Sequence, residues 1–271
     1  MTGRLVVCPT PIGNLEDVTL RVLSALRDAD VVACEDTRRT RVLLDRYGVK
    51  ARLVSYHEHN ERARAAELVA RMREGAVVAL VSDAGMPLIS DPGFLLVRGC
   101  VAAGLPVEVL PGPSAAITAL VASSLPADEW HFHGFLPRKK GELRRVLQEP
   151  GGTLVAFESP RRVPATLELL AELDPGREVA VCRELTKAHE EIVRGPAAEL
   201  AARYADAPPK GEVVLVLAPP TANDDSAEAA GADALRRLVD AGAHPRTAAA
   251  VVAELTGGSA NALYRALTAS D

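Results

Sequence analysis

Aromatic residues are scarce in this chain: they make up 3% of its 271 residues, and Trp130 is the only tryptophan. Stacking platforms for single-stranded nucleic acid use several aromatic side chains, so we do not expect such a platform here. Cysteine is also sparse, and the four residues have neither CxxC nor zinc-ligand spacing. We expect reduced, buried thiols in a cytoplasmic protein, because the sequence carries no secretory leader and no apolar run of membrane-spanning length.

Charge and composition are those of an ordinary soluble globular protein. Hydrophobic residues make up 48% of the chain and charged residues 25%, and the net charge of −5 argues against a general polyanion binder. Basic residues nevertheless gather at 38–41, 138–145 and 161–162. Solvated helix faces explain most such clusters, so each one alone is weak evidence for an anionic partner.

The order of apolar runs predicts two α/β domains, over residues 1–124 and 125–220. In the first, five strands (4–8, 31–34, 53–56, 76–81, 107–110) alternate with five helices (near 19–27, 37–46, 61–74, 94–103, 114–123). In the second, four strands (131–135, 153–157, 178–182, 212–218) accompany three helices (141–148, 162–173, 196–204). The alternation predicts a mostly parallel first sheet. Residues 221–231 have linker composition, and 232–271 are expected to form a helical, helix-turn-helix-like module.

Loops rich in glycine and proline follow three of the expected strands. The clearest reads SDAGMPLISDPG (82–93), and the others are CPTPIGN (8–14) and LPGPSA (110–115). Glycine permits φ > 0 and close approach of a ligand to the backbone, and ligands of open α/β sheets bind at the carboxyl ends of strands. None of the loops matches GxGxxG or GxxxxGK[ST], so a dinucleotide or P-loop phosphate site is not indicated. Asp83 and Asp91 favour a ligand with positive charge or hydroxyl groups.

Seven motifs occur in one order along the chain: TPIGN (10–14), CEDTRRT (34–40), SDAGMPLISDPG (82–93), LPGPSA (110–115), FHGFLPRKKG (132–141), FESPRR (157–162) and RELTK (183–187). As an ordered set they closely resemble the ribosomal RNA small subunit methyltransferase I family of the tetrapyrrole-methylase superfamily. The resemblance covers nearly the whole chain. It implies a two-domain tetrapyrrole-methylase-like α/β fold (class III methyltransferase) and a homodimer. It also implies S-adenosylmethionine-dependent 2′-O-methylation of a cytidine in the decoding region of 16S rRNA, and the sequence leaves open whether the free RNA or the 30S ribosomal subunit is the partner.

The resemblance also implies roles for individual residues. Those expected to approach the cofactor lie in the three loops and in two segments of the second domain: Pro9, Pro11, Asp83, Ala84, Gly85, Pro87, Ile89, Ser90, Ser114, Ala115, Phe157 and Gly211. Methyl transfer from a sulfonium is an in-line displacement that needs alignment and a group to accept or offset charge at the hydroxyl. We expect Glu35 and Lys187 to provide the catalytic surroundings, with an ion-pair network as the alternative reading of each. RNA phosphates are expected at Arg38, Arg39, Arg138, Lys139 and Lys140.

Three further points remain open from the sequence. His57 and His59 flank Glu58 and could suggest a metal, but a polar loop is the preferred interpretation, and no metal is expected. The helical module has few cations, so RNA contact and support of folding or docking are equally compatible with it. The competing functions are methylation of a precorrin or another small tetrapyrrole, and RNA binding by a non-catalytic ribosome-assembly factor.

Overall fold

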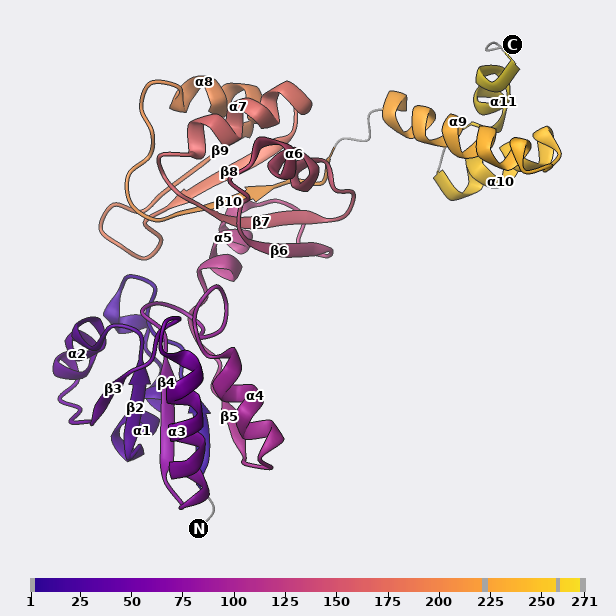
Figure 1. The fold of residues 1–271 in the computed structure, drawn as a ribbon. Coiled ribbons are helices and arrows are strands. Elements are labelled where there is room, and N and C mark those ends of the chain that lie inside the picture. Colours follow the sequence, from indigo (N-terminus) through magenta and orange to yellow (C-terminus); the bar gives the residue numbers. More distant parts are fainter. Residues whose placement is uncertain (1–2, 221–223, 257–258, 269–271) are drawn as a thin grey trace. The chain divides into compact units, whose positions relative to one another are not determined.

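The computed structural model describes residues 3–220, 224–256 and 259–268 (Figure 1). The chain forms two compact units, Met1–Pro219 and Pro220–Asp271, and each is described by itself. None of the described helices is long and apolar enough to cross a membrane.

The first sheet is wholly parallel, as the alternation of apolar runs predicts. Its strands are β1 (Arg4–Val7), β2 (Val31–Cys34), β3 (Leu53–Ser55), β4 (Val77–Val81) and β5 (Val107–Val109), in the order β3-β2-β4-β1-β5. The short helix η1 (Leu15–Asp17), α1 (Leu20–Asp28) and α2 (Thr37–Arg46) pack on one face, and α3 (Glu61–Arg73) and α4 (Phe94–Ala102) pack on the other. The buried strand residues are mostly valine, leucine and alanine, which is typical of a sheet covered on both faces.

The N-terminus of α4 is capped by a carboxylate from the neighbouring helix α3. Gly93 stands at the N-cap of α4 and has no side chain with which to cap it. Glu61 of α3 takes this role, because its Oε1 accepts the N–H groups of Gly93 (3.0 Å) and Leu95 (3.2 Å). The hydroxyl of buried Tyr56 donates to the same oxygen at 3.0 Å. One carboxylate thereby satisfies donors that the first turn of a helix leaves open and joins α3 to α4.

The second sheet is mixed. Its strands are β6 (Trp130–Phe135), β7 (Thr153–Glu158), β8 (Glu178–Arg183), β9 (Glu191–Pro196) and β10 (Val213–Leu217), in the order β6-β7-β10-β8-β9. Only β6 and β7 pair in parallel. Helices α6 (Lys140–Gln148), α7 (Val163–Leu173) and α8 (Ala197–Tyr204) cover one face. The edge strand β9 was not predicted, because its sequence EIVRGP has only two consecutive apolar residues before Arg194 and Gly195.

Helix α5 (Ala115–Ser123) covers the other face of this second sheet. The sequence assigns it to the first domain, 1–124, but Ala116, Ala119 and Leu120 pack with Val155 and Val214 of the second sheet. The guanidinium of Arg194 on β9 also donates to the carbonyl oxygens of Ala122 and Ser123 at the end of α5. The helix that covers this face of the second sheet therefore comes from the segment that directly follows β5, a strand of the first sheet.

The described residues of the C-terminal unit form three helices, α9 (Asp224–Asp240), α10 (Pro245–Thr256) and α11 (Ala260–Thr268), packed around Leu235, Val252 and Leu263. The predicted linker 221–231 is wrong for residues 224–231, which are the first turns of α9, and residues 221–223 lie outside the described residues. The segment is rich in alanine, whose high helix propensity outweighs its linker-like polarity. A Cβ at Gly231 would lie 2.9 Å from Leu263, so glycine there allows α9 and α11 to pack closely.

Candidate active site

A cavity of about 470 Å³ lies where strand ends of both sheets meet. The first sheet contributes loops after β1, β2, β4 and β5, and the second contributes the ends of β6 and β7, the loop after β8 and the turn before β10. The residues that line it are Ile12, Glu35, Arg39, Asp83, Ala84, Gly85, Met86, Ile89, Ser90, Asp91, Ser114, Ala115, Phe135, Phe157, Glu158, Ser159, Pro160, Leu185, Gly211, Glu212, Val213 and Val214. The volume is in the range of small-molecule sites.

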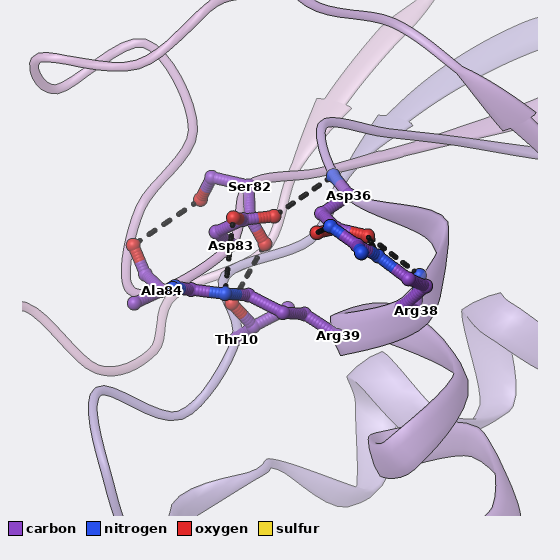
Figure 2. A network of polar contacts seen from close by, with 7 residues as sticks. All are labelled: Thr10, Asp36, Arg38, Arg39, Ser82, Asp83 and Ala84. Carbon is purple, nitrogen blue, oxygen red and sulfur yellow. Dashed lines mark hydrogen bonds and ion pairs between the residues drawn. The ribbon is translucent and has the colours of Figure 1, made fainter.

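Two loops of the first sheet are bonded to each other at the cavity. Thr10 and Gly85 form an isolated antiparallel bridge in which each N–H donates to the other's carbonyl oxygen at 2.9 Å. The Thr10 hydroxyl donates to the Ser82 carbonyl at 3.1 Å, and the Ser82 hydroxyl donates to the Ala84 carbonyl at 3.3 Å (Figure 2). The Ser82 hydroxyl also lies 3.2 Å from the Gly85 carbonyl oxygen. Gly85 has a φ of 74°, which favours glycine. The bridge holds the backbone of both loops at the cavity wall.

Asp83 connects the second loop to the segment after β2. Its Oδ1 accepts the Asp36 N–H at 2.9 Å, and its Oδ2 lies 3.5 Å from Nε of Arg39 (Figure 2). Asp36 in turn caps α2 and binds Arg38 through both carboxylate oxygens, at 3.1 and 2.7 Å. The hydrogen bonds from Arg38 lower the pKa of Asp36 to about 2. The EDTRR motif is therefore an interlocked set of charges beside the cavity.

Glu35, Asp83 and Asp91, from the loops of the first sheet, are among the residues that line the cavity. Burial raises the pKa of Asp91 to about 7, and the charges of Glu35 and Asp83 act in the same direction. Burial and the charge of Asp83 also raise the pKa of Glu35, although Arg39 opposes this. A cation or a hydroxyl donor placed among these groups would stabilise their ionised forms. The sequence indicated Asp83 and Asp91 as partners of a positively charged or hydroxyl-bearing ligand, and in the structure Glu35 lines the same cavity.

Backbone strain is concentrated in the loops around the cavity. Leu88 and Ser90 have φ values of 74° and 66°, and in the loop after β8 the values are 52° for Glu184 and 65° for Thr186. Non-glycine residues rarely adopt positive φ, and such residues cluster at functional sites. Both sides of the cavity therefore carry a backbone conformation that the surrounding packing must maintain.

Lys187 lies in the strained loop after β8 and is held by two carboxylates. Its Nζ is 2.8 Å from Oε1 of Glu184 and 2.9 Å from Oε2 of Glu212. The same Glu184 oxygen accepts the Glu212 N–H, which fixes the turn that brings Gly211 and Glu212 to the cavity. The loop also contacts the first sheet, because the hydroxyl of Thr186 accepts the N–H of Asn14 at 2.9 Å.

The structure brings most of the predicted cofactor-binding residues together. Nine of these residues line the cavity, as does the predicted catalytic residue Glu35: Asp83, Ala84, Gly85, Ile89, Ser90, Ser114, Ala115, Phe157 and Gly211. Among the described residues, Pro9, Pro11 and Pro87 are outside the lining. All three are buried, and Pro9 is so close to Gly112 that a Cβ there would lie 2.4 Å from Pro9 Cγ. These prolines restrict the backbone of the cavity loops without lining the cavity.

Other predicted residues are also outside the cavity lining, as the described residues define it. Lys187 is one of them, and its Nζ pairs with Glu184 and with the lining residue Glu212. Of the predicted RNA-binding residues, Arg39 alone lines the cavity. Arg38 is exposed, as are Arg138, Lys139 and Lys140, and the two lysines pair with Glu142 and Glu172, respectively.

Sequence reasoning missed lining residues of the second domain, notably Phe135 and the segment 158–160. Glu158 is fully buried, and its carboxylate accepts from the Ser159 N–H and the Thr166 hydroxyl and pairs with Arg162. In the FESPRR motif, Glu158 thus lines the cavity and also holds the motif together through these bonds. Within residues 3–220, 224–256 and 259–268, no three His, Cys, Asp or Glu side chains are grouped so that they could hold a metal ion.

A family model described as tetrapyrrole (corrin/porphyrin) methylases matches residues 4–201. The chain is 48% identical to ribosomal RNA small subunit methyltransferase I of Mesorhizobium japonicum, over 97% of this chain and 90% of that protein. It is 46% identical to the protein of the same name from Escherichia coli O157:H7, over 97% and 94%. The Thermotoga maritima protein of that name is 45% identical over 79% of this chain and 98% of its own length, so about one fifth of this chain has no counterpart in it.

Solved structures share the fold at low sequence identity. Uroporphyrin-III C-methyltransferase from Thermus thermophilus superposes with a TM-score of 0.59 at 24% identity, over 80% of this chain and 94% of that one. A structure of a Thermus thermophilus enzyme of that name with S-adenyl homocysteine has a TM-score of 0.57 at 22% identity, over 80% and 97%. The predicted two-sheet architecture is thereby confirmed at the level of fold.

Proposed function

The chain belongs to the tetrapyrrole methylase family and is an rRNA methyltransferase, and from this premise we propose that it methylates the ribose 2′-hydroxyl of a cytidine in the decoding region of 16S rRNA, with S-adenosylmethionine as methyl donor. We propose further that it acts on the 30S subunit, in the cytoplasm and as a homodimer. The observation that carries the proposal is the cavity in which loop backbone from both sheets surrounds Glu35, Asp83 and Asp91.

The cavity residues fit S-adenosylmethionine in size and in charge. A volume of about 470 Å³ is within the range of cofactor sites, and Gly85, with a φ of 74°, is part of the cavity wall. The carboxylates of Glu35, Asp83 and Asp91 complement a sulfonium cation, and apolar groups of Ile12, Phe157 and Val214 are available to pack against the adenine ring. When bound, S-adenosylmethionine supplies a methyl group on a positively charged sulfur, which is a good leaving group.

The residues of the chain align the acceptor and take up its proton. The transfer breaks the S–CH₃ bond and forms an O–CH₃ bond, and the hydroxyl proton must leave. We assign its acceptance to Glu35, whose pKa is raised above its usual range and which lies among the cavity carboxylates. Arg39 beside Asp83 limits the repulsion among the carboxylates. Lys187 holds the turn at Glu212 in place, so its proposed role is positioning.

The charge of the cavity favours a nucleoside over a tetrapyrrole as methyl acceptor. Tetrapyrrole precursors carry several carboxylates, which the ionised forms of Glu35 and Asp83 would repel. A ribose is neutral, and the phosphates on either side of it can remain outside. Arg38 and Arg39, 88% and 62% exposed, lie beside the cavity where such phosphates would pass.

The experiment uses 30S subunits from a strain that lacks this methylation, together with S-adenosylmethionine labelled in its methyl group. We expect label on one ribose, mapped to a cytidine by mass spectrometry of nuclease fragments, and a loss of turnover in Glu35→Gln that exceeds any loss of cofactor affinity. The exposed Glu16→Gln is the matched control and should have wild-type turnover. Label on a precorrin in place of RNA would indicate a tetrapyrrole methylase. Tight binding of 30S subunits without transfer would indicate an assembly factor.

A further inference from the structure

Phe135 is an exposed aromatic side chain at the cavity. It lines the cavity, and 63% of its surface is accessible to solvent. The chain has only four phenylalanines, and exposing a large apolar ring to water is unfavourable unless a ligand covers it. Phe157 lies against it, with ring centroids 5.5 Å apart and planes inclined by 62°. Phe157 therefore packs against the Phe135 ring, and the remaining surface of the ring is exposed to solvent.

A β-bulge orients Phe135 toward the cavity. The register between β6 and β7 shifts between Phe132 and Gly134, and Gly134 has a φ of 75°. In a regular strand, residues three apart point to opposite faces. Here both Phe132 and Phe135 contact Phe157, with ring centroids at 5.0 and 5.5 Å. Bulges next to active sites redirect side chains, and this one places two rings on the same side of β6.

The bulge also contacts the strained loop after β4. A Cβ at Gly134 would lie 3.3 Å from the Ser90 hydroxyl oxygen, so the two segments are neighbours. Ile89, next to Ser90, also lines the cavity and is 43% exposed. Two neighbouring segments, the loop after β4 and strand β6, thus each place an exposed apolar side chain at the cavity: Ile89 from the loop and Phe135 from the strand.

We propose that Phe135 is the surface on which the base of the target nucleotide stacks when its ribose enters the cavity. This inference rests on the proposed function and extends it to the recognition of the substrate. An enzyme that acts on one nucleotide in folded RNA must unstack that nucleotide, and proteins replace the lost stacking with aromatic side chains. A single base needs a single ring, so the scarcity of aromatics that excludes an extended platform does not exclude this contact.

The sequence after Phe135 suits RNA on either side of the stacked base. Arg138, Lys139 and Lys140 follow within five residues and are all exposed. Cations close to a stacked base can contact the phosphates of adjacent nucleotides. An aromatic ring and a basic segment on one connection, β6 to α6, form the arrangement that base stacking with phosphate contact requires.

The test compares Phe135→Leu, Phe135→Trp and the control Phe94→Leu in methylation of 30S subunits. Phe94 is 61% exposed but is outside the cavity lining formed by the described residues, which makes it a matched control. Loss of one base-stacking ring should lower kcat/KM for 30S subunits roughly 5- to 150-fold in Phe135→Leu. Phe135→Trp should stay within about threefold of wild type because it keeps the stacking surface. Phe94→Leu should match wild type.

Calorimetric titration with S-adenosylmethionine separates base stacking from cofactor stacking. The affinity should be unchanged in Phe135→Leu, and a fall parallel to the loss of kcat/KM would overturn the inference in favour of a cofactor contact. A wild-type rate in Phe135→Leu, or an equal loss in Phe94→Leu, would also overturn it. A wild-type enzyme that methylates no rRNA would refute the proposed function itself, and the inference with it.

Discussion

Replacement of Asp91 by asparagine should make the protein more stable at neutral and alkaline pH and leave it unchanged in acid. Burial and the charges of Glu35 and Asp83 raise the pKa of Asp91 from 3.8 to about 7. The folded state therefore disfavours the ionised carboxylate. Below about pH 4 the carboxyl is neutral in both states and contributes nothing. Between pH 4 and 7 the unfolded chain ionises first, so the folded state loses stability, and above pH 7 this loss is constant.

The size of the effect follows from the shift in pKa. A shift of about three units corresponds to roughly 4 kcal/mol at 1.36 kcal/mol per unit. Because Asp91 is only partly buried, solvent screening reduces this figure, and we expect about 1–2 kcal/mol at pH 8. For a protein of this size that raises Tm by about 2–6 °C. Asparagine has nearly the same shape and keeps a polar group near Ser82.

The assay is thermal and urea unfolding of wild type and Asp91→Asn from pH 4 to pH 9. The difference in the free energy of unfolding should be close to zero at pH 4, rise through pH 5–7 and then stay level. Glu35→Gln is an informative companion variant, because removing that charge should lower the pKa of Asp91 and shift the rise to lower pH. A stability difference that is the same at pH 4 and pH 8 would refute the reasoning.

Three other predictions concern the loops and the units of the fold. Gly85→Val should abolish binding of S-adenosylmethionine in calorimetry, because it strains a residue with a φ of 74° at the cavity wall. The control is Gly104→Val, where φ is 66° and no atoms lie within 4 Å of an added Cβ; this variant should be less stable but should still bind the cofactor. Glu61→Ala should lower the free energy of unfolding by about 1–3 kcal/mol by leaving the first N–H groups of α4 unpaired, and a smaller loss by urea titration would show that water replaces the carboxylate. A chain that ends at Pro219 should fold and bind S-adenosylmethionine with unchanged affinity, since every cavity residue precedes that point, and loss of binding would contradict this.

The first sheet was predictable because its strands are short runs of mostly β-branched or aliphatic residues between turn signals, and those of β1, β2 and β4 are largely buried. Each parallel strand must be followed by a crossover, so the parallel direction of the strands follows from the alternation, whereas their order β3-β2-β4-β1-β5 does not. The cavity loops were predictable for the same reason, since strand ends of a parallel sheet meet at one edge. The strand ends indicated the loops, and the family resemblance indicated individual residues within them, of which Asp83, Gly85 and Ser114 line one cavity.

The features that were not predicted depend on contacts between distant segments. The α5 sequence AAITALVAS is apolar almost all round, so its pattern does not indicate which sheet it covers. The bulge at Gly134 depends on the register with β7, which local sequence does not specify. Lys187 has the residue type of a catalytic group, and only the positions of Glu184 and Glu212 reveal its pairing.

The placement of α5 has a consequence for the order in which the chain folds during synthesis. The first sheet is complete once β5 has been made, and α5 follows it directly. The partners of Ala116, Ala119 and Leu120 on β7, β8 and β10 are made later, and β10 ends at Leu217. For about a hundred residues of synthesis, several seconds at ribosomal rates of ~5–20 residues per second, this apolar helix has no sheet to cover. A nascent chain arrested near residue 150 should therefore bind chaperones that recognise apolar surface, and one arrested well beyond β10 should release them.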